Sequence, residues 1–422
     1  MPGRIIIITT ADVIVVGGGV IGVCSAYYLA KSGRSVILLE QGEIASGCSY
    51  GNACLITPSH AVPLPAPGVI RQALKWMLKE DSPLLIRARL DFQLLRWLLQ
   101  FAQNCRPEAM MRGIPILRDL CRASLALYEE LVRTENLEFY FERRGALYVS
   151  STDAGFEKSK REAELLAGYG FDSRILGGRN AHELEPAVLE TVKGAVYYPE
   201  DAHGDSHFFV TGLGRLLPKY GVTIRTNTRA LGLLPADGDR IAVNTDQGVF
   251  QCKDLLLAAG SWLPGLTRAF GVSLPIQPGK GYSVTISKPE GAPKIPVAHQ
   301  ERRVFVTPLG DRLRFAGTME FAGMDLRMNN TRAQAALRGG REILLPFGEP
   351  RNIEYWCGLR PCTPDGIPVI GRIPRHPNVY VAAGHAMLGF TMGPITGKLA
   401  SEMITGAPLS LAMGALSPGR FL

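Results

Sequence analysis

The strongest constraint on the fold is a glycine-rich turn between two short apolar runs near the start of the chain. Residues 12–16 (DVIVV) have the composition of a buried strand, and residues 17–22 (GGGVIG) follow with glycines at the first, third and sixth positions. Residues 20–32 are typical of a helix that ends before Gly33, and residues 35–39 (SVILL) are typical of a second buried strand. The segment therefore predicts a strand–turn–helix–strand unit.

Each glycine of the turn has its own physical role. Gly17 permits the tight turn, Gly19 lets the backbone approach a diphosphate, and Gly22 lets the helix pack against the strand. The diphosphate would bind the free N–H groups at the start of the helix, where Val20 and Ile21 lie.

An acidic residue completes the pattern. Glu40 ends the second strand, 18 positions after Gly22, and Gln41 follows it. A carboxylate at this place accepts hydrogen bonds from the ribose hydroxyls of a dinucleotide. Strand, glycine turn, helix and acid together predict a dinucleotide-binding site.

Composition limits the other functional classes. Of 422 residues, 46% are hydrophobic and 20% are charged, and the net charge of +8 is spread without a dense Lys/Arg run. This favours a globular enzyme of two interleaved domains and argues against nucleic-acid binding. No uncharged stretch reaches about 18 residues, so no transmembrane helix is expected. The eight cysteines lack CxxC spacing, and no secretory leader is recognisable, so a cytoplasmic location is expected.

Three further segments carry a resemblance to a known family. They are residues 46–53 (SGCSYGNA), residues 255–261 (LLLAAGS) and residues 358–394, which contain GLRPCTPDGIPVIG and NVYVAAGHAMLGFTMGP. With the glycine turn, they resemble the FAD-dependent D-amino acid dehydrogenases, within the wider family of D-amino acid, glycine and sarcosine oxidases. No second GxGxxG is present that could hold a nicotinamide cofactor. The resemblance implies FAD as the cofactor, bound non-covalently.

The resemblance also implies a set of flavin contacts. Those in the loop and at the strand end are Ser46, Ser49, Gly51, Asn52, Ala53, Ala259 and Gly260. Those under the flavin ring are Gly384, His385, Met387, Leu388, Gly389, Phe390 and Thr391, whose backbone N–H groups would face the pyrimidine edge. Related enzymes tend to have glycine at Ala386, so the geometry on the substrate side depends on how this alanine is accommodated.

Arg360 matches the arginine that binds the substrate carboxylate in the oxidases. A planar guanidinium can hold a carboxylate bidentately and stays charged at any working pH. The alternative is a surface salt bridge. His60 either approaches the flavin or is a loop histidine without cofactor contact. Tyr282 and Tyr355 either line the substrate pocket or pack in the core.

Two other patterns have competing interpretations. His203 and His207 have the HxxxH spacing of metal ligands, but a turn and a helix cap are predicted between them, so no metal is expected. Residues 84–101 predict an amphipathic helix, which is either buried against the second domain or lies at a membrane surface, where it would reach quinone.

The pattern of elements and the resemblance imply an α/β fold with an α+β second domain. Residues 1–63, 196–264 and 351–422 would form a discontinuous Rossmann-like FAD-binding domain of the glutathione reductase type. Residues 64–195 and 265–350 would form a substrate domain built on an antiparallel sheet.

The resemblance implies oxidation of a small amino acid, either a D-amino acid or a cyclic imino acid of the proline or hydroxyproline type. Hydride transfer from the α-carbon to flavin N5 would give an imine, and then a 2-oxo acid and ammonia. Electrons would pass to a quinone or another redox partner in preference to O2. The alternatives are a glycine- or sarcosine-type amine oxidase that uses O2, and the FAD-bearing subunit of a hetero-oligomeric dehydrogenase. A homo- or hetero-oligomer, and peripheral contact with the inner face of a membrane, are compatible with the sequence.

Overall fold

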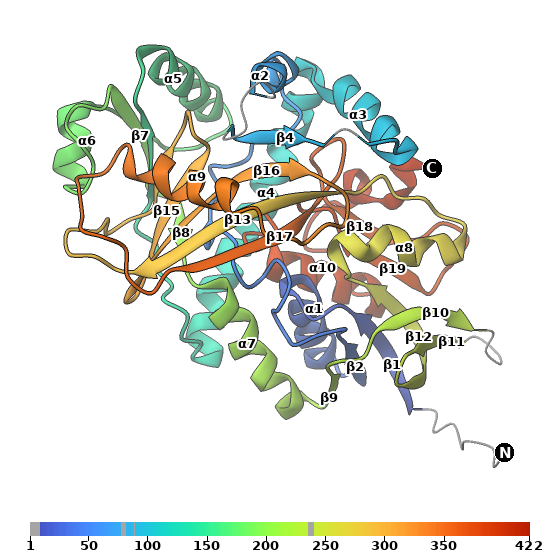
Figure 1. Ribbon diagram of the computed structural model, residues 1–422. Coiled ribbons are helices and arrows are strands. Elements are labelled where there is room, and N and C mark those ends of the chain that lie inside the picture. Colours follow the sequence, from blue (N-terminus) through green and yellow to red (C-terminus); the bar gives the residue numbers. More distant parts are fainter. Residues whose placement is uncertain (1–8, 77–81, 88, 235–239) are drawn as a thin grey trace.

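Two large sheets with helices on their faces form the molecule (Figure 1). The computed structural model describes residues 9–76, 82–87, 89–234 and 240–422. The strands of the first sheet are β1 (Thr9–Val16), β2 (Val36–Leu39), β9 (Val222–Arg225), β10 (Ala230–Leu234), β11 (Ile241–Thr245), β12 (Gly248–Leu257), β18 (Val369–Arg372) and β19 (Val379–Ala383). Their order is β10-β11-β12-β1-β2-β9, with β19 beside β12 and β18 beside β19.

The centre of the first sheet is parallel. β1 pairs with β2 on one side and with β12 on the other, and Val13–Val16 and Val36–Leu39 are buried. Such apolar strands are typical of a parallel sheet that is covered on both faces. The predicted strand–turn–helix–strand unit is confirmed, because α1 (Val20–Lys31) connects β1 to β2. The long strand β12 pairs antiparallel with β11 and parallel with β1.

The second sheet is mainly antiparallel. In sheet order, its strands are β17 (Glu354–Cys362), β13 (Gln277–Ser287), β16 (Arg312–Phe321), β15 (Val304–Leu309), β14 (Val297–His299), β5 (Ala146–Ser150), β7 (Gly194–Tyr198) and β6 (Arg174–Gly177). β4 (Leu84–Ile86) pairs with β16, and helix α9 (Asn330–Arg341) packs on β13 and β16. The antiparallel sheet that the sequence predicts is therefore present. β3 (Leu55–Ile56) and β8 (Ala202–His203) form a separate small pair.

Strand pairing differs from the predicted domain boundaries at two places. Residues 196–198 belong to β7 and residues 354–362 to β17, so both lie in the second sheet and not in the first. The reason is physical: β17 pairs with β13 over its whole length, a contact between segments about 75 residues apart that local patterns do not reveal.

The remaining helices cover the sheets. They are α2 (Val69–Trp76), α3 (Phe92–Asn104), α4 (Pro107–Glu135), α5 (Asp153–Ala167), α6 (Gly178–Leu184), α7 (Ser206–Leu216), α8 (Leu263–Thr267) and α10 (Gly393–Thr405). α4 packs against α10, where the Tyr128 hydroxyl donates to the Phe390 carbonyl oxygen. Residues of α1, α4, α7 and α10 thus share one hydrophobic core.

The predicted helix over residues 84–101 is wrong in its first part. Leu84–Ile86 is the strand β4, held by its pairing with β16, and α3 begins only at Phe92, after the cap Asp91. Asp91 accepts hydrogen bonds from two backbone N–H groups of the first helical turn, which ends the extended segment at that point.

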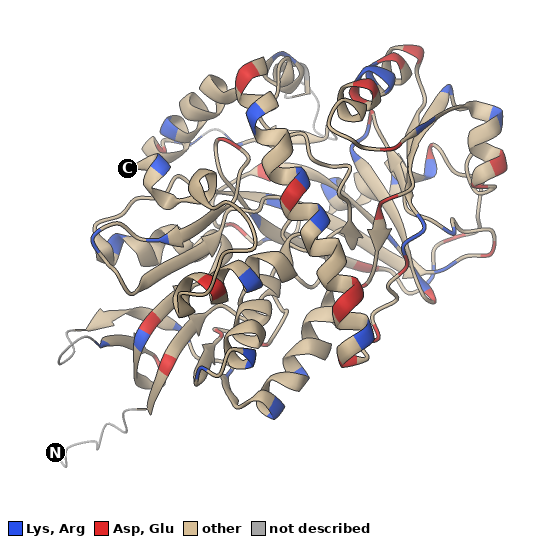
Figure 2. Cartoon of the chain, turned by 180° about the vertical axis from the view of Figure 1, so that it is seen from behind, with Lys and Arg blue, Asp and Glu red and all other residues tan. Residues whose placement is uncertain are grey.

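His203 lies in β8 and His207 in α7, and no group of three or more potential metal ligands occurs in the part of the chain that the structure describes. None of the described helices combines the length and apolar character needed to cross a bilayer. Figure 2 shows basic and acidic residues interspersed over the described elements, without a large block of one sign.

Candidate cofactor and substrate site

A large cavity is lined by elements of both sheets. Its volume is about 2130 Å³, and it is lined by the β1–α1 turn, the ends of β2 and β12, strands β16 and β17, helices α2 and α3, and the turn before α10. These elements bring together segments from the beginning, middle and end of the chain. A cavity at the carboxyl ends of parallel strands is the usual ligand site of such sheets.

Gly17 and Gly22 of the glycine turn occupy places that a residue with a side chain could not take. Gly17 has φ +119°, which L-residues with side chains rarely adopt, and a Cβ on Gly22 would lie 1.7 Å from the Gly17 carbonyl oxygen. Gly22 does not line the cavity, in agreement with its expected role in helix–strand packing. The turn therefore brings bare backbone to the cavity.

Backbone N–H groups at the start of α1 face the cavity. Val20 N–H donates to Ser49 Oγ at 2.9 Å, while the N–H groups of Gly19 and Ile21 have no acceptor in the described residues. All four residues line the cavity. Unpaired N–H groups at a helix N-terminus fit a diphosphate.

Glu40 lies at the other side of this turn. Its carboxylate accepts hydrogen bonds from Gly18 N–H at 2.6 Å and Gly42 N–H at 2.8 Å, and it lines the cavity together with Gln41. Each carboxylate oxygen retains a lone pair for a ribose hydroxyl. The residues present thus fit the adenosine half of a dinucleotide.

The loop after β2 supplies the next part of the wall. Ser46, Asn52 and Ala53 line the cavity, as do Ala259 and Gly260 at the end of β12. Gly51 and Gly384, two of the predicted flavin contacts, do not line the cavity. A Cβ on Gly51 would lie 2.3 Å from the Trp356 ring, and one on Gly384 would lie 2.6 Å from Thr363 Cγ2, so both glycines serve close packing behind the wall.

The turn before α10 forms the opposite wall, and His385, Met387, Leu388, Gly389, Phe390 and Thr391 all line the cavity. The backbone N–H groups of Gly389, Phe390 and Thr391 have no acceptor among the described residues. The His385 side chain is hydrogen-bonded to Thr396 Oγ1. Burial lowers the pKa of His385 to about 3, so this side chain is neutral. Free N–H groups beside the positive end of α10 can stabilise negative charge on a reduced flavin.

Ala386 is accommodated by an unusual backbone conformation. Its φ is +47°, in the left-handed region that favours glycine, and its N–H donates to the Pro361 carbonyl oxygen. The alanine therefore follows the path that a glycine would take.

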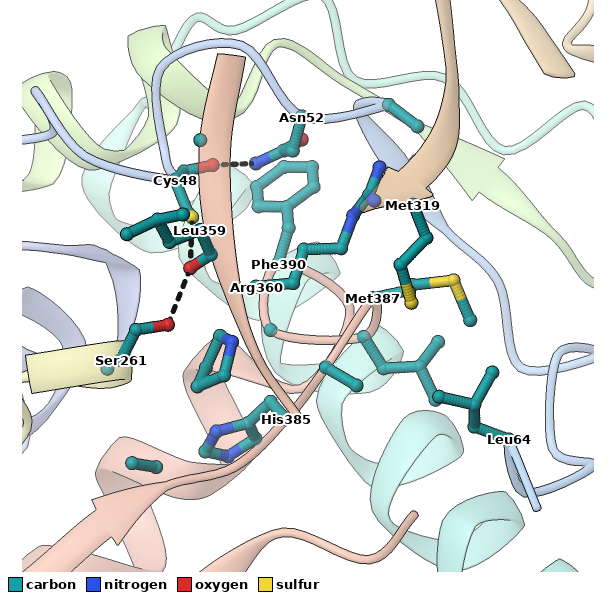
Figure 3. Close-up of a pocket in the computed structure, with 18 of the residues that line it drawn as sticks. Cys48, Asn52, Leu64, Ser261, Met319, Leu359, Arg360, His385, Met387 and Phe390 are labelled. Carbon is teal, nitrogen blue, oxygen red and sulfur yellow. Dashed lines mark hydrogen bonds between the residues drawn. The ribbon is translucent and has the colours of Figure 1, made fainter. Parts of the chain in front are cut away.

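Arg360 projects from β17 into the cavity (Figure 3). Its Nη1 donates to the Thr318 carbonyl oxygen at 2.7 Å, and no described Asp or Glu forms an ion pair with it. Burial lowers the pKa of the guanidinium, but arginine starts high enough to stay charged. Met319, Met387 and Leu64 line the same cavity (Figure 3). The result is a cation with free donors in an otherwise apolar part of the cavity.

Comparison with known proteins agrees with this geometry. Residues 12–403 match the DAO family, described as FAD dependent oxidoreductase. The chain belongs to this family. A D-amino acid dehydrogenase from Paramagnetospirillum magneticum is 37% identical over 97% of this chain and 98% of its own length. One from Methylobacterium radiotolerans is 34% identical over 97% and 99%.

Solved structures of the DAO fold are also similar. Glycine oxidase from Geobacillus kaustophilus has a TM-score of 0.80 at 22% identity, covering 98% of this chain and 100% of that one. L-proline dehydrogenase from P. horikoshii has a TM-score of 0.74 at 22% identity, with 98% of both chains covered. The expected α/β fold with a Rossmann-like FAD-binding part is confirmed, and this DAO-family protein is an FAD-dependent oxidoreductase.

Three other residues that the sequence suggests for the site lie at different places relative to the cavity. His60 lines the cavity, and burial lowers its pKa to about 4, so it is neutral at pH 7. Tyr282 is not among the described lining residues. It lies 1% exposed under the sheet, where its hydroxyl donates to Glu320. Tyr355 is 38% exposed and also lies outside the lining, so neither tyrosine lines the substrate pocket of this DAO-family enzyme.

Some lining residues carried no sequence signal. Thr318 and Met319 on β16 and Trp356 on β17 belong to strands whose pairing is set by distant segments. On the nucleotide side, Thr228 follows β9, and its N–H donates to the Glu40 carbonyl oxygen. Only the parallel pairing of β2 with β9 could have placed it there.

Proposed function

We propose that this enzyme oxidises the α-carbon of a D-amino acid or a cyclic imino acid, with Arg360 holding the substrate carboxylate. The observation that carries the proposal is the unpaired guanidinium in the cavity between the two sheets. A partly buried cation that no described acid neutralises is unfavourable unless a ligand supplies the negative charge. A carboxylate matches that requirement and the planar shape of the group.

The protein's own residues mainly bind and orient. FAD, when bound, supplies the acceptor for the hydrogen and two electrons that leave the α-carbon. Arg360 would fix the carboxylate, while the apolar side chains of Leu64, Met319 and Met387 would exclude water around the α-carbon. Neutral His60 and His385 add no competing positive charge. The released imine would hydrolyse to a 2-oxo acid and ammonia, or persist if it is cyclic.

The names of the relatives support the substrate class. Proteins 32–37% identical to this chain are named D-amino acid dehydrogenase. Two of the structurally similar proteins are named for glycine and L-proline, which are also small α-amino acids. The D configuration therefore rests on the more similar group of relatives.

A substrate panel tests the proposal. The purified holoenzyme is mixed without oxygen with D- and L-amino acids, D-proline, hydroxyprolines, glycine and sarcosine, and flavin absorbance is followed near roughly 450 nm. We expect rapid bleaching by several D-amino acids or D-proline and little by the L-enantiomers. Bleaching by glycine or sarcosine alone, with peroxide formed in air, would point to the amine oxidase alternative. No bleaching by any member would reject the proposal.

We further propose that the electron acceptor is a quinone reached from a membrane surface. Large apolar side chains are exposed on α2 and α3 and just before α3: Ile70, Leu74, Leu90, Phe92, Leu95 and Leu99. Leu74 is 62% exposed and also lines the cavity, so the cavity reaches the surface at α2. Arg71 and Arg96 are exposed on the same two helices. Apolar residues flanked by arginines favour an anionic lipid surface.

A further inference from the structure

The Arg360 side chain lies directly over a glycine of the neighbouring strand. In the β13–β17 ladder, Gly279 pairs with Arg360 and Gly281 pairs with Gly358. A Cβ built on Gly281 would lie 2.2 Å from Cζ of Arg360 and 2.2–2.3 Å from both Nη atoms. The guanidinium therefore crosses β13 in a space that exists only because residue 281 has no side chain.

Beyond β13, the guanidinium meets an irregular point of β16. Lys280 pairs with Glu320 but Tyr282 pairs with Gly317, so β16 has one more residue than β13 in this interval. This extra residue makes a β-bulge at Thr318, which has φ +55°. A bulge takes a carbonyl group out of the regular ladder, and here the Thr318 carbonyl oxygen accepts the hydrogen bond from Arg360.

Thr318 is unfavourable at this position in two ways. A β-branched residue rarely adopts a left-handed conformation, and the buried Oγ1 of Thr318 has no hydrogen-bond partner among the described residues. Strain of this kind persists where the surrounding structure holds it, and it is commonest at functional sites.

Glu320, the acid of β16 that follows Met319, contacts other residues on the opposite face of the sheet from Arg360. Side chains alternate along a strand, so Lys280 and Tyr282 point away from the face that carries Arg360. Both contact Glu320, which also pairs with Arg87. These buried contacts tie β13 to β16 beneath Arg360 and leave the guanidinium facing the cavity without an acidic partner.

We propose that Gly281 and the Thr318 bulge are positioning elements that set the orientation of Arg360 through bare backbone. Because Gly281 has no side chain, the Arg360 side chain can lie across β13 at this point. The Thr318 carbonyl oxygen accepts a hydrogen bond from Nη1 of Arg360. The other donors stay free for a carboxylate. The inference rests on the proposed function, because it concerns how the substrate anchor is preorganised.

Carboxylate binding to the Gly281→Ala holoenzyme tests the inference. Propionate is titrated and followed by the change in the flavin spectrum, a readout that needs no turnover. We expect its dissociation constant to rise about tenfold or more, because displacement of an anchoring group by about 1 Å has effects of that size or larger. The neutral propionamide should bind equally to variant and wild type. With the best amino acid substrate, KM should rise more than kcat falls.

Gly279→Ala is the matched control. Gly279 lies on the same strand, and the nearest atoms to a Cβ there would be those of Cys362 and Met319, at 3.1–3.4 Å, and not the guanidinium of Arg360. We expect its propionate affinity to stay within about twofold of wild type. Equal effects of the two substitutions, or wild-type propionate binding by folded Gly281→Ala, would overturn the inference.

A double variant covers a failure to fold. If Gly281→Ala does not fold because of the conflict with Arg360, then Gly281→Ala/Arg360→Ala should fold and bind FAD as Arg360→Ala does. If the double variant also fails while Arg360→Ala folds, Gly281 is needed for another reason and the inference is wrong. If Arg360→Ala itself leaves propionate binding unchanged, the proposed function fails first, which is a distinguishable result.

Discussion

At the scale of single residues, some positions of the cofactor site must be glycine because an added side chain would collide with neighbouring atoms. Gly22 is the clearest case, since a methyl group there would lie 1.7 Å from the Gly17 carbonyl oxygen. That contact could be relieved only by moving α1 away from β1, which would also move the free N–H groups of the helix start. Close packing of this kind does not absorb an added carbon without a backbone shift.

We therefore expect Gly22→Ala to be purified largely without flavin. The measurement is the ratio of flavin to protein absorbance, followed by titration of the apoprotein with FAD, whose dissociation constant should rise about 100-fold. Gly232→Ala is the control, because Gly232 lies in the same sheet on β10, where an added methyl group would have nothing within 4 Å. Full flavin content in Gly22→Ala would contradict the assignment of this turn to the diphosphate.

Asp201 is a residue whose protonation should affect stability. It is fully buried, its carboxyl group accepts hydrogen bonds from Ser59 N–H and Oγ–H, and burial raises its pKa to about 7. In the unfolded chain it ionises near pH 4. Between about pH 4 and pH 7 the folded state therefore holds a proton that the unfolded state has lost. Its stabilising contribution is complete below pH 4 and is lost as the pH rises through 7.

Asp201→Asn should remove this dependence. The free energy of unfolding of the variant, minus that of wild type, should rise by roughly 2–4 kcal/mol between pH 4 and pH 7. Urea unfolding of both proteins at several pH values measures it. The buried histidines, whose pKa values are lowered, affect both proteins equally and cancel in the difference. A constant difference across this range would show that Asp201 is ionised in the folded protein.

At the scale of elements, α3 combines two different faces. Trp97 is 2% exposed and its indole N–H donates to the Cys362 carbonyl oxygen, whereas Phe92 is 89% exposed and Leu99 is 59% exposed. An amphipathic helix normally turns polar residues outward. The outward apolar face of α3 thus calls for a covering surface, which we propose to be lipid.

Replacing Phe92, Leu95 and Leu99 together with glutamine should weaken binding to anionic vesicles about tenfold or more, because the loss of exposed apolar area removes most of the interfacial attraction. Co-sedimentation with vesicles that contain phosphatidylglycerol measures it. Flavin content and the reaction with a soluble dye should stay unchanged. The control replaces exposed Ile175 and Leu184, which lie on β6 and α6 at the other end of the second sheet. If the wild-type protein does not co-sediment with such vesicles, the membrane proposal is wrong.

At the scale of the whole molecule, the contrast between local and distant contacts explains which predictions succeeded. The unit from β1 to β2 was predicted within a few residues because its glycines, helix and acid act within about 30 residues of each other. The sequence predicts helix where β4 lies, and it does not reveal that β17 belongs to the second sheet, because pairing with β16 and β13 decides both. Propensity is routinely overridden by such tertiary contacts.

The same contrast applies to the site. Arg360 was found because it lies within a recognisable motif, and the structure places it in the cavity. Gly281 and Thr318 have no motif, since their roles arise from a one-residue difference between two strands and a side chain from a third. For Tyr282 the sequence leaves pocket and core open, and its place on β13 decides for the core, because one step along a strand changes the face of the sheet.

The central claim is that Arg360 binds the substrate carboxylate in an FAD-dependent enzyme that oxidises amino acids. Its most direct test is anaerobic rapid mixing of wild type and Arg360→Met with the best substrate of the panel, with the rate of flavin bleaching followed against substrate concentration. We expect the concentration for half-maximal rate to rise about 100-fold in the variant, equivalent to about 2.7 kcal/mol, with flavin content unchanged. The same concentration dependence in both proteins would contradict the claim.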